Sequence, residues 1–269
     1  MAEERVKLRA KVAARVFKEV FKNLGPKHLK GVDHFYVVVD TEKLELQFIS
    51  ECKDIMLIVV LKKTLFASYD YPEEQPYLCK YHLADFSALG VLFPNNKQTL
   101  NLTILSESLA LEGGTNPGDI LFKVSAINTN DDDEERLVSP EDLRSENQCL
   151  ELSVNRVGIL DGILRFSKST RLRRLWFRFD TVRQRLEVTD AKEDGEMKIS
   201  FGVKEVRKVA LFAEMQFDPK MIDCAINLLP KESELVLAFY PNSLLIDVPE
   251  RQKLFSIRIN SCNNENPHL

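Results

Sequence analysis

The chain has 269 residues, which exceeds one typical domain and suits two domains of about 130 residues each. Hydrophobic residues make up 44% and charged residues 29%, as in ordinary globular proteins, and the formal net charge of −4 excludes a chain that is basic throughout. The sequence contains no run of 18 apolar residues and no signal-peptide pattern, so we expect an intracellular protein without a membrane span.

The first half predicts strands interrupted by two helices. A strand over 6–10 alternates apolar and basic residues, and a helix over 11–24 ends at Gly25-Pro26. A second, shorter helix over 83–93 is closed by Pro94. The other predicted elements are a hairpin at 35–50 with its turn at Asp40, strands at 55–66 and 77–83, a hairpin at 99–113 and a strand at 120–127.

Residues 128–148 interrupt this pattern. The segment NTNDDDEERLVSPEDLRSENQ is polar, acidic and aperiodic, which is typical of a linker between domains. We expect the acidic run 131–135 to be a solvated connector, because no loop motif arranges its carboxylates around a metal ion.

After the linker the same order of elements returns. The predicted elements are a strand at 151–154, a helix at 156–169, a hairpin at 175–190, strands at 197–202 and 206–217, a helix at 218–229, a hairpin at 234–248 and a strand at 253–259. Asp40-Thr41 in the first hairpin recurs as Asp180-Thr181, and both short helices end at a proline. The sequence therefore predicts an α+β fold made of two copies of one unit, with domains at 1–127 and 149–269.

Positive charge gathers on the first helix of each half. On a helical wheel Lys11, Arg15, Lys18 and Lys22 share an arc of about 60°, opposite the apolar residues. Four like charges on one arc repel one another, whereas an ordinary solvated face mixes signs. We therefore predict that this stripe faces a polyanion; a plain surface helix is the alternative.

The first helix of the second half carries a weaker version of the stripe. Arg165 and Lys168 lie on its outward face, and Arg171 follows in the connection to the next strand. These cations face either a phosphate backbone or the acidic surface of a neighbouring protein. Contacts with phosphates would give salt-sensitive association with DNA that does not depend on base sequence.

Catalytic patterns are absent from the sequence. The five scattered cysteines form no CxxC pair, the four histidines show no ligand spacing, and no P-loop, GxSxG or GxGxxG motif occurs. Asp40 and Asp180 occupy turns, where side-chain hydrogen bonds to the backbone explain them. We expect reduced thiols, no catalytic residues, no metal, no cofactor and no enzymatic activity.

The duplicated unit with its acidic linker resembles the sliding-clamp fold of proliferating cell nuclear antigen. Within that family VKLRAKV (6–12), GDILFKV (118–124) and NSLLIDVPERQKLFSIRI (242–259) are similar to the Hus-type subunit of the nine-one-one checkpoint clamp. LALEGG (109–114) and INT (127–129) are similar to the Rad-type subunit of the same ring.

The resemblance implies a ring of three two-domain subunits around double-stranded DNA, with helices lining the hole. Its DNA-facing residues would be Lys11, Arg15, Lys18, Lys22, Arg165, Lys168 and Arg171. It further implies a nuclear heterotrimer with two other clamp subunits, a clamp loader, and checkpoint and repair proteins as partners. Strand edges near 102–112 and 206–215 would close the ring. The alternatives are a homotrimeric replication clamp, and a scaffold or divergent enzyme on the same fold.

Overall fold

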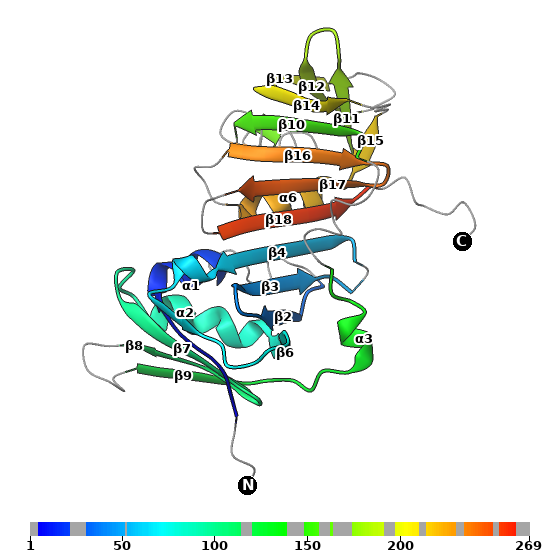
Figure 1. The fold of residues 1–269 in the computed structure, drawn as a ribbon. Coiled ribbons are helices and arrows are strands. Elements are labelled where there is room, and N and C mark those ends of the chain that lie inside the picture. Colours follow the sequence, from blue (N-terminus) through cyan, green and yellow to red (C-terminus); the bar gives the residue numbers. More distant parts are fainter. Residues whose placement is uncertain are drawn as a thin grey trace. The chain divides into compact units, whose positions relative to one another are not determined.

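The structure is a computed structural model that describes residues 5–21, 31–51, 53–113, 120–138, 148–155, 162–163, 174–190, 197–209, 214–229, 234–249 and 253–261. The chain divides into two compact units (Figure 1), the first formed mainly by residues 1–51 and 58–137 and the second mainly by 138–249 and 255–269. The predicted domain limits, 1–127 and 149–269, stay predictions.

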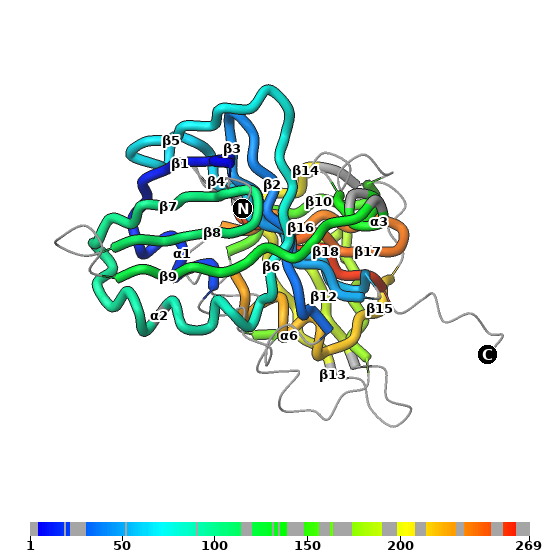
Figure 2. Tube along the Cα trace, turned by 90° about the horizontal axis from the view of Figure 1, so that it is seen from below, coloured from blue at the N-terminus to red at the C-terminus, as the bar shows by residue number. Residues whose placement is uncertain are grey.

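The first unit contains two groups of antiparallel strands. One sheet has the order β5-β1-β7-β8-β9, and its strands run side by side in Figure 2. The other group has the order β4-β3-β2-β6. The strands are β1 (Val6–Ala13), β2 (His34–Val39), β3 (Lys43–Ile49), β4 (Ile55–Lys62), β5 (Ser68–Asp70), β6 (Tyr77–His82), β7 (Thr99–Leu105), β8 (Ser108–Gly113) and β9 (Ile120–Ser125). A 3-10 turn, η1 (Lys63–Leu65), follows β4.

Aromatic packing holds the helices of this unit against both groups of strands. The helical segments are α1 (Ala14–Phe21), the 3-10 helix η2 (Leu83–Ala88) and α2 (Leu89–Leu92). Measured between ring centroids, Phe86 of η2 lies 4.8 Å from Phe21 of α1, 4.8 Å from Phe35 of β2 and 5.5 Å from Phe122 of β9. Because rings from helix and both groups of strands meet at Phe86, their burial fixes the position of the helices.

The boundary between β1 and α1 differs from the prediction. The strand continues to Ala13, paired with Thr99 of β7, and the helix begins only at Ala14. The alternation of exposed and buried side chains also continues, since Lys11 is exposed and Val12 is buried. The predicted helix over 11–24 was wrong in its first turn. The apolar pattern of residues 11–13 suits a strand or a helix, and pairing with β7 makes them part of a strand.

The second unit again has two antiparallel sheets. Their orders are β14-β10-β16-β17-β18 and β13-β12-β11-β15. Phe177 of β11 lies 6.2 Å from Phe239 of β16 and 5.3 Å from Phe217 of β15, so the buried faces of the two sheets meet. The elements are β10 (Leu150–Asn155), β11 (Leu175–Asp180), β12 (Arg185–Asp190), β13 (Met197–Gly202), β14 (Glu205–Val209), β15 (Met215–Phe217), α6 (Pro219–Leu228), β16 (Glu234–Tyr240), β17 (Ser243–Pro249) and β18 (Lys253–Asn260).

The two predicted aspartate turns have the same atomic structure. Asp40 Oδ1 accepts hydrogen bonds from the backbone N–H groups of Glu42 and Lys43, at 2.7 and 2.9 Å. Asp180 Oδ1 accepts from those of Val182 and Arg183, both at 2.9 Å. Each turn joins two adjacent strands, β2–β3 and β11–β12. The duplication inferred from the sequence therefore extends to individual hydrogen bonds.

Part of the acidic linker packs onto the first unit. Residues Asp131–Glu134 form a short helix, α3, and Asp133 is only 4% exposed. Its Oδ1 accepts from the Tyr36 hydroxyl at 2.7 Å and from Lys80 Nζ at 2.8 Å. The expectation of a solvated connector was wrong for Asp133, because these distant partners satisfy its buried carboxylate. Asp132 and Glu135 are exposed.

The predicted ring-closing edges are corrected in the first unit. The segment 102–112 covers β7 and β8, which lie inside their sheet, and the edge strands are β5 and β9. The second segment, 206–215, includes most of β14, which does lie at the end of its sheet. β13 is at the end of the other sheet of the second unit.

Candidate nucleic-acid interface

Two cations of the predicted stripe lie on α1. Val16, Phe17 and Val20 are buried, while Arg15 is exposed and Lys18 is half-buried. The helix is short and amphipathic, so its apolar side is covered by the core and its basic side stays accessible.

The segment that follows α2 orients these cations. Lys18 Nζ donates to the Pro94 carbonyl oxygen at 3.1 Å and to Asn96 Oδ1 at 2.6 Å. The backbone N–H of Ala14 donates to the Gln98 carbonyl oxygen at 2.8 Å. Both acceptors of Lys18 are uncharged, so they hold the ammonium group in place without neutralising its charge.

A third cation comes from the same segment. Lys97 is exposed and follows Asn96, whose backbone carbonyl accepts from the N–H of Arg15 at 3.3 Å. We call Arg15, Lys18 and Lys97 the α1 basic surface. Lys97 was not predicted because it lies in a loop; the signal was a basic residue three positions after Pro94, the proline that ends the short helix.

The other predicted DNA-facing residues have different outcomes. Lys11 lies on β1, on the strand face opposite the buried Ala10 and Val12, so the helical stripe was wrong for this residue. The predicted cations outside the described residues are Lys22, Arg165, Lys168 and Arg171. The structure therefore brings together Arg15 and Lys18, adds Lys97 and separates Lys11 from the helix.

The α1 basic surface is suited to phosphates. Its ammonium and guanidinium groups carry charge without a pattern of donors and acceptors that would distinguish base pairs. An exposed arrangement of this kind exchanges bound counterions for phosphates and binds more weakly as salt rises. It can hold a duplex without selecting its sequence.

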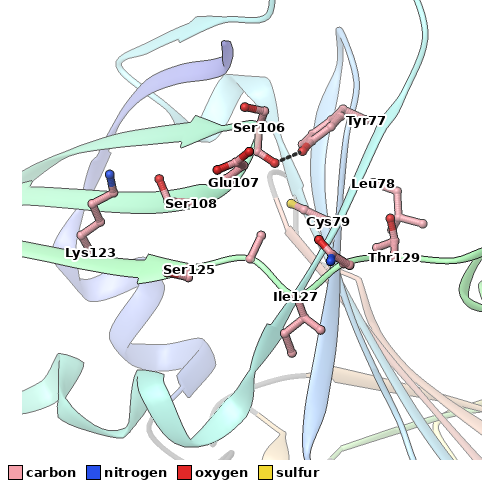
Figure 3. A pocket seen from close by; sticks show the side chains of 12 residues that line it. Tyr77, Leu78, Cys79, Ser106, Glu107, Ser108, Lys123, Ser125, Ile127 and Thr129 are labelled. Atoms are coloured by element: carbon pink, nitrogen blue, oxygen red, sulfur yellow. Dashed lines mark hydrogen bonds between the residues drawn. The ribbon is translucent and has the colours of Figure 1, made fainter. Parts of the chain in front are cut away.

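A polar pocket of about 460 Å³ lies elsewhere in the first unit, between β6 and the β8–β9 end of the neighbouring sheet (Figure 3). Tyr77 donates its hydroxyl hydrogen to the Ser106 carbonyl oxygen at 2.9 Å. Burial raises the pKa of the Cys79 thiol to about 12 and that of Tyr77 to about 12. Both groups are therefore protonated at neutral pH, and Cys79 is not an activated nucleophile.

Two further features of the described residues bear on function. No group of three or more His, Cys, Asp or Glu residues within them is arranged to hold a metal ion. In the same part of the chain, no helix has the length and apolar character needed to cross a membrane.

Comparison by sequence gives no match to a protein-family model or to a curated protein. Comparison by fold matches nearly the whole chain. PCNA from Thermococcus kodakaraensis is 18% identical, with a TM-score of 0.74 over 94% of this chain and 99% of that chain. A. fulgidus PCNA, solved with the C-terminal region of FEN-1, is 12% identical, with a TM-score of 0.73 over 94% and 98%.

A third solved structure is the PCNA2–PCNA3 complex from Sulfolobus tokodaii. It is 14% identical, with a TM-score of 0.71 over 94% of this chain and 99% of that chain. The predicted fold class is therefore confirmed: the chain has the duplicated α+β fold of the sliding clamps. Identities this low show the fold alone.

Proposed function

We propose that the chain is one subunit of a heterotrimeric ring of the nine-one-one type, which encircles duplex DNA in the nucleus. The ring acts as a platform for checkpoint signalling and repair proteins and performs no chemistry of its own. The observation that carries this proposal is the α1 basic surface on a fold that matches sliding clamps over 94% of the chain.

The DNA contact rests on Arg15, Lys18 and Lys97, with Lys22, Arg165, Lys168 and Arg171 as further candidates from the sequence. Such cations stabilise a ring on DNA through phosphates, so the subunit can move along a duplex of any sequence. Lys11 lies on β1 and not on α1, so it serves as the control in tests of the DNA contact.

The solved clamps support a hetero-oligomer with protein clients. The Sulfolobus tokodaii structure holds two different clamp subunits together, and the A. fulgidus clamp carries a segment of FEN-1. The segments 6–12, 118–124 and 242–259 of this chain favour the Hus-type subunit of the checkpoint ring. An ATP-driven loader would open such a ring and place it on DNA.

Ring closure needs strands that can accept a neighbour. Within the described residues, β9 pairs with β8 on one side only, and β13 and β14 each end a sheet. The exposed backbone groups of an edge strand can extend a sheet into another subunit. We assign β9 and either β13 or β14 to the subunit contacts.

Native mass spectrometry of the complex recovered with a tagged copy tests the subunit composition. Three different chains of similar mass, one copy each, are expected. A single species near 92.7 kDa, three times the 30.9 kDa chain, would instead establish the homotrimeric replication clamp. A monomer would contradict both forms of the proposal.

Alanine substitution tests the DNA contact. Replacing Arg15, Lys18 and Lys97 together should weaken association of the assembled ring with DNA and reduce the dependence of log affinity on log salt by about 0.9 for each lost phosphate contact. The matched control is Lys11→Ala, which removes one cation from the exposed face of β1. Equal effects of Lys11→Ala and Lys18→Ala would contradict the assignment of the α1 basic surface.

A further inference from the structure

Two histidines that are far apart in the sequence face each other across β2 and β6. His34 and His82 are direct cross-strand partners, and their ring centroids lie 4.5 Å apart. His82 is exposed and His34 is half-buried. No metal-ligand spacing is visible in the sequence because strand register, rather than a local motif, brings the two imidazoles together.

The hydrogen bonds of the neighbouring residues identify the geometry of this pair. The backbone N–H of Leu83 donates to the Asp33 carbonyl oxygen at 2.9 Å, so Asp33 and Leu83 form a hydrogen-bonded pair. Because such pairs alternate along antiparallel strands, His34 and His82 form a non-hydrogen-bonded pair, whose side chains approach more closely.

The surroundings leave room for an ion and its water. A pocket of about 280 Å³ is lined by both histidines together with Asp33, Leu83 and two smaller side chains, Val32 and Ala84. A single water occupies roughly 30 Å³ of liquid volume, so several coordinated waters fit. The carboxylate of Asp33 adds negative charge at this pocket.

The nearest lysine has its own counterion. Lys80 lies two residues before His82, on the same face of β6, and its Nζ is 2.8 Å from Asp133 Oδ1. This ion pair offsets the repulsion that Lys80 would exert on a bound cation. Burial lowers the pKa of His34, and His82 and Lys80 lower it further, whereas Asp33 and Asp133 raise it. Neutral imidazole is the form that binds metals.

We propose that His34 and His82 form a binding site for one divalent transition-metal ion, and that this ion is zinc. Zinc–nitrogen bonds of about 2.0–2.1 Å in tetrahedral geometry require the two ligating nitrogens to be about 3.3 Å apart. The centroids of the two histidine rings lie 4.5 Å apart and their planes are tilted by 42°. Water fills the other positions, and imidazole selects zinc, nickel or copper over magnesium or calcium.

Titration calorimetry of the full chain with zinc chloride near neutral pH tests the site. One ion per chain is expected, and each of His34→Gln and His82→Gln should weaken binding by more than about tenfold. His28→Gln keeps the same histidine count as the single variants and should bind zinc like the parent chain. Magnesium chloride should give no binding at this site.

Two further measurements, melting temperature and circular dichroism, distinguish the loss of a zinc ligand from misfolding. Zinc should raise the melting temperature of the parent chain, and this rise should disappear in His82→Gln, whose side chain is exposed and whose far-ultraviolet circular dichroism should match the parent. The proposal is overturned if the parent chain does not bind zinc, or if both histidine variants bind it as tightly as the parent.

Discussion

The two halves of the chain repeat the same aspartate turn but build their short helix differently. In the second half α6 is a ten-residue α-helix, with Pro219 at its start and the Asp218 side chain accepting from the Lys220 N–H at 2.7 Å. In the first half the corresponding segment begins with the six-residue 3-10 helix η2 and ends with the four-residue α2. His82 precedes η2 and provides no side-chain cap.

This difference shows how one position in a duplicated fold can be stabilised in two ways. A capping aspartate and an N-terminal proline favour the first turn of α6 locally. The segment η2 instead depends on Phe86, whose ring contacts aromatic rings from four other elements, including Phe21 and Phe122. The first short helix is thus held mainly by packing, the second by packing together with capping.

The largest effect is expected at the aromatic centre of the first half. Phe86→Ala should lower the free energy of unfolding by about 4 kcal/mol, since it removes a buried ring and leaves a cavity. Urea unfolding of the full chain measures this loss. Phe86→Leu, which keeps most of the volume, should cost clearly less. Equal losses for the two variants would show that packing at this position does not support the first short helix.

A second feature of the first half is the carboxylate of Asp133, a linker residue that packs onto the first unit. Asp133→Ala should cost about 2 kcal/mol, because the Lys80 ammonium and the Tyr36 hydroxyl lose a charged hydrogen-bond partner. Asp132→Ala, which removes an exposed acid from the same run, is the matched control and should have little effect. Similar losses in urea unfolding would contradict the packed position of Asp133.

The pH dependence of the same pair sharpens this test. Burial raises the pKa of Asp133, but hydrogen bonds from Lys80 and Tyr36 outweigh burial and hold it below the ordinary value of 3.8. A lowered pKa means that the stabilisation is present above the unfolded value and is lost as pH falls through the folded one. The stability difference between parent and Asp133→Ala should therefore be constant near neutral pH and shrink below about pH 4.

The smallest effect is expected from capping. Asp218→Ala should cost about 1 kcal/mol, because the Lys220 N–H loses its acceptor. At the corresponding position of the first half, His82→Ala in metal-free buffer should change stability by about 0.5 kcal/mol or less. Thermal unfolding of the two variants measures the contrast directly. A larger loss for His82→Ala would reverse the proposed division between capping and packing.

Local patterns in the sequence predicted much of this fold. Strand alternation, the turns at Asp40 and Asp180 and the prolines that end the short helices act within a few residues, so they can be read without the structure. The end of β1 could not be read, because Val12 and Ala13 suit a strand or a helix and the pairing with β7 decides between them. For the same reason Lys11 was predicted on a helix, whereas it lies on β1.

The candidate sites depended still more on distant partners. Arg15 and Lys18 were predicted because both lie on one helix, whereas Lys97 joins them only through the contacts of Asn96. The partners of Asp133 are Tyr36 and Lys80, which lie 97 and 53 residues before it in the sequence. The facing histidines required the register of β2 and β6.

Retention on circular and linear DNA tests most directly whether the chain belongs to a ring that encircles DNA. The recovered complex, loaded on nicked circular duplex with its loader and then washed at raised salt, should stay bound and should leave when one cut linearises the circle. A ring can slide off an open end, whereas an ordinary phosphate-binding protein is released by salt from both forms alike. Equal retention on circular and linearised DNA would contradict the proposed clamp function.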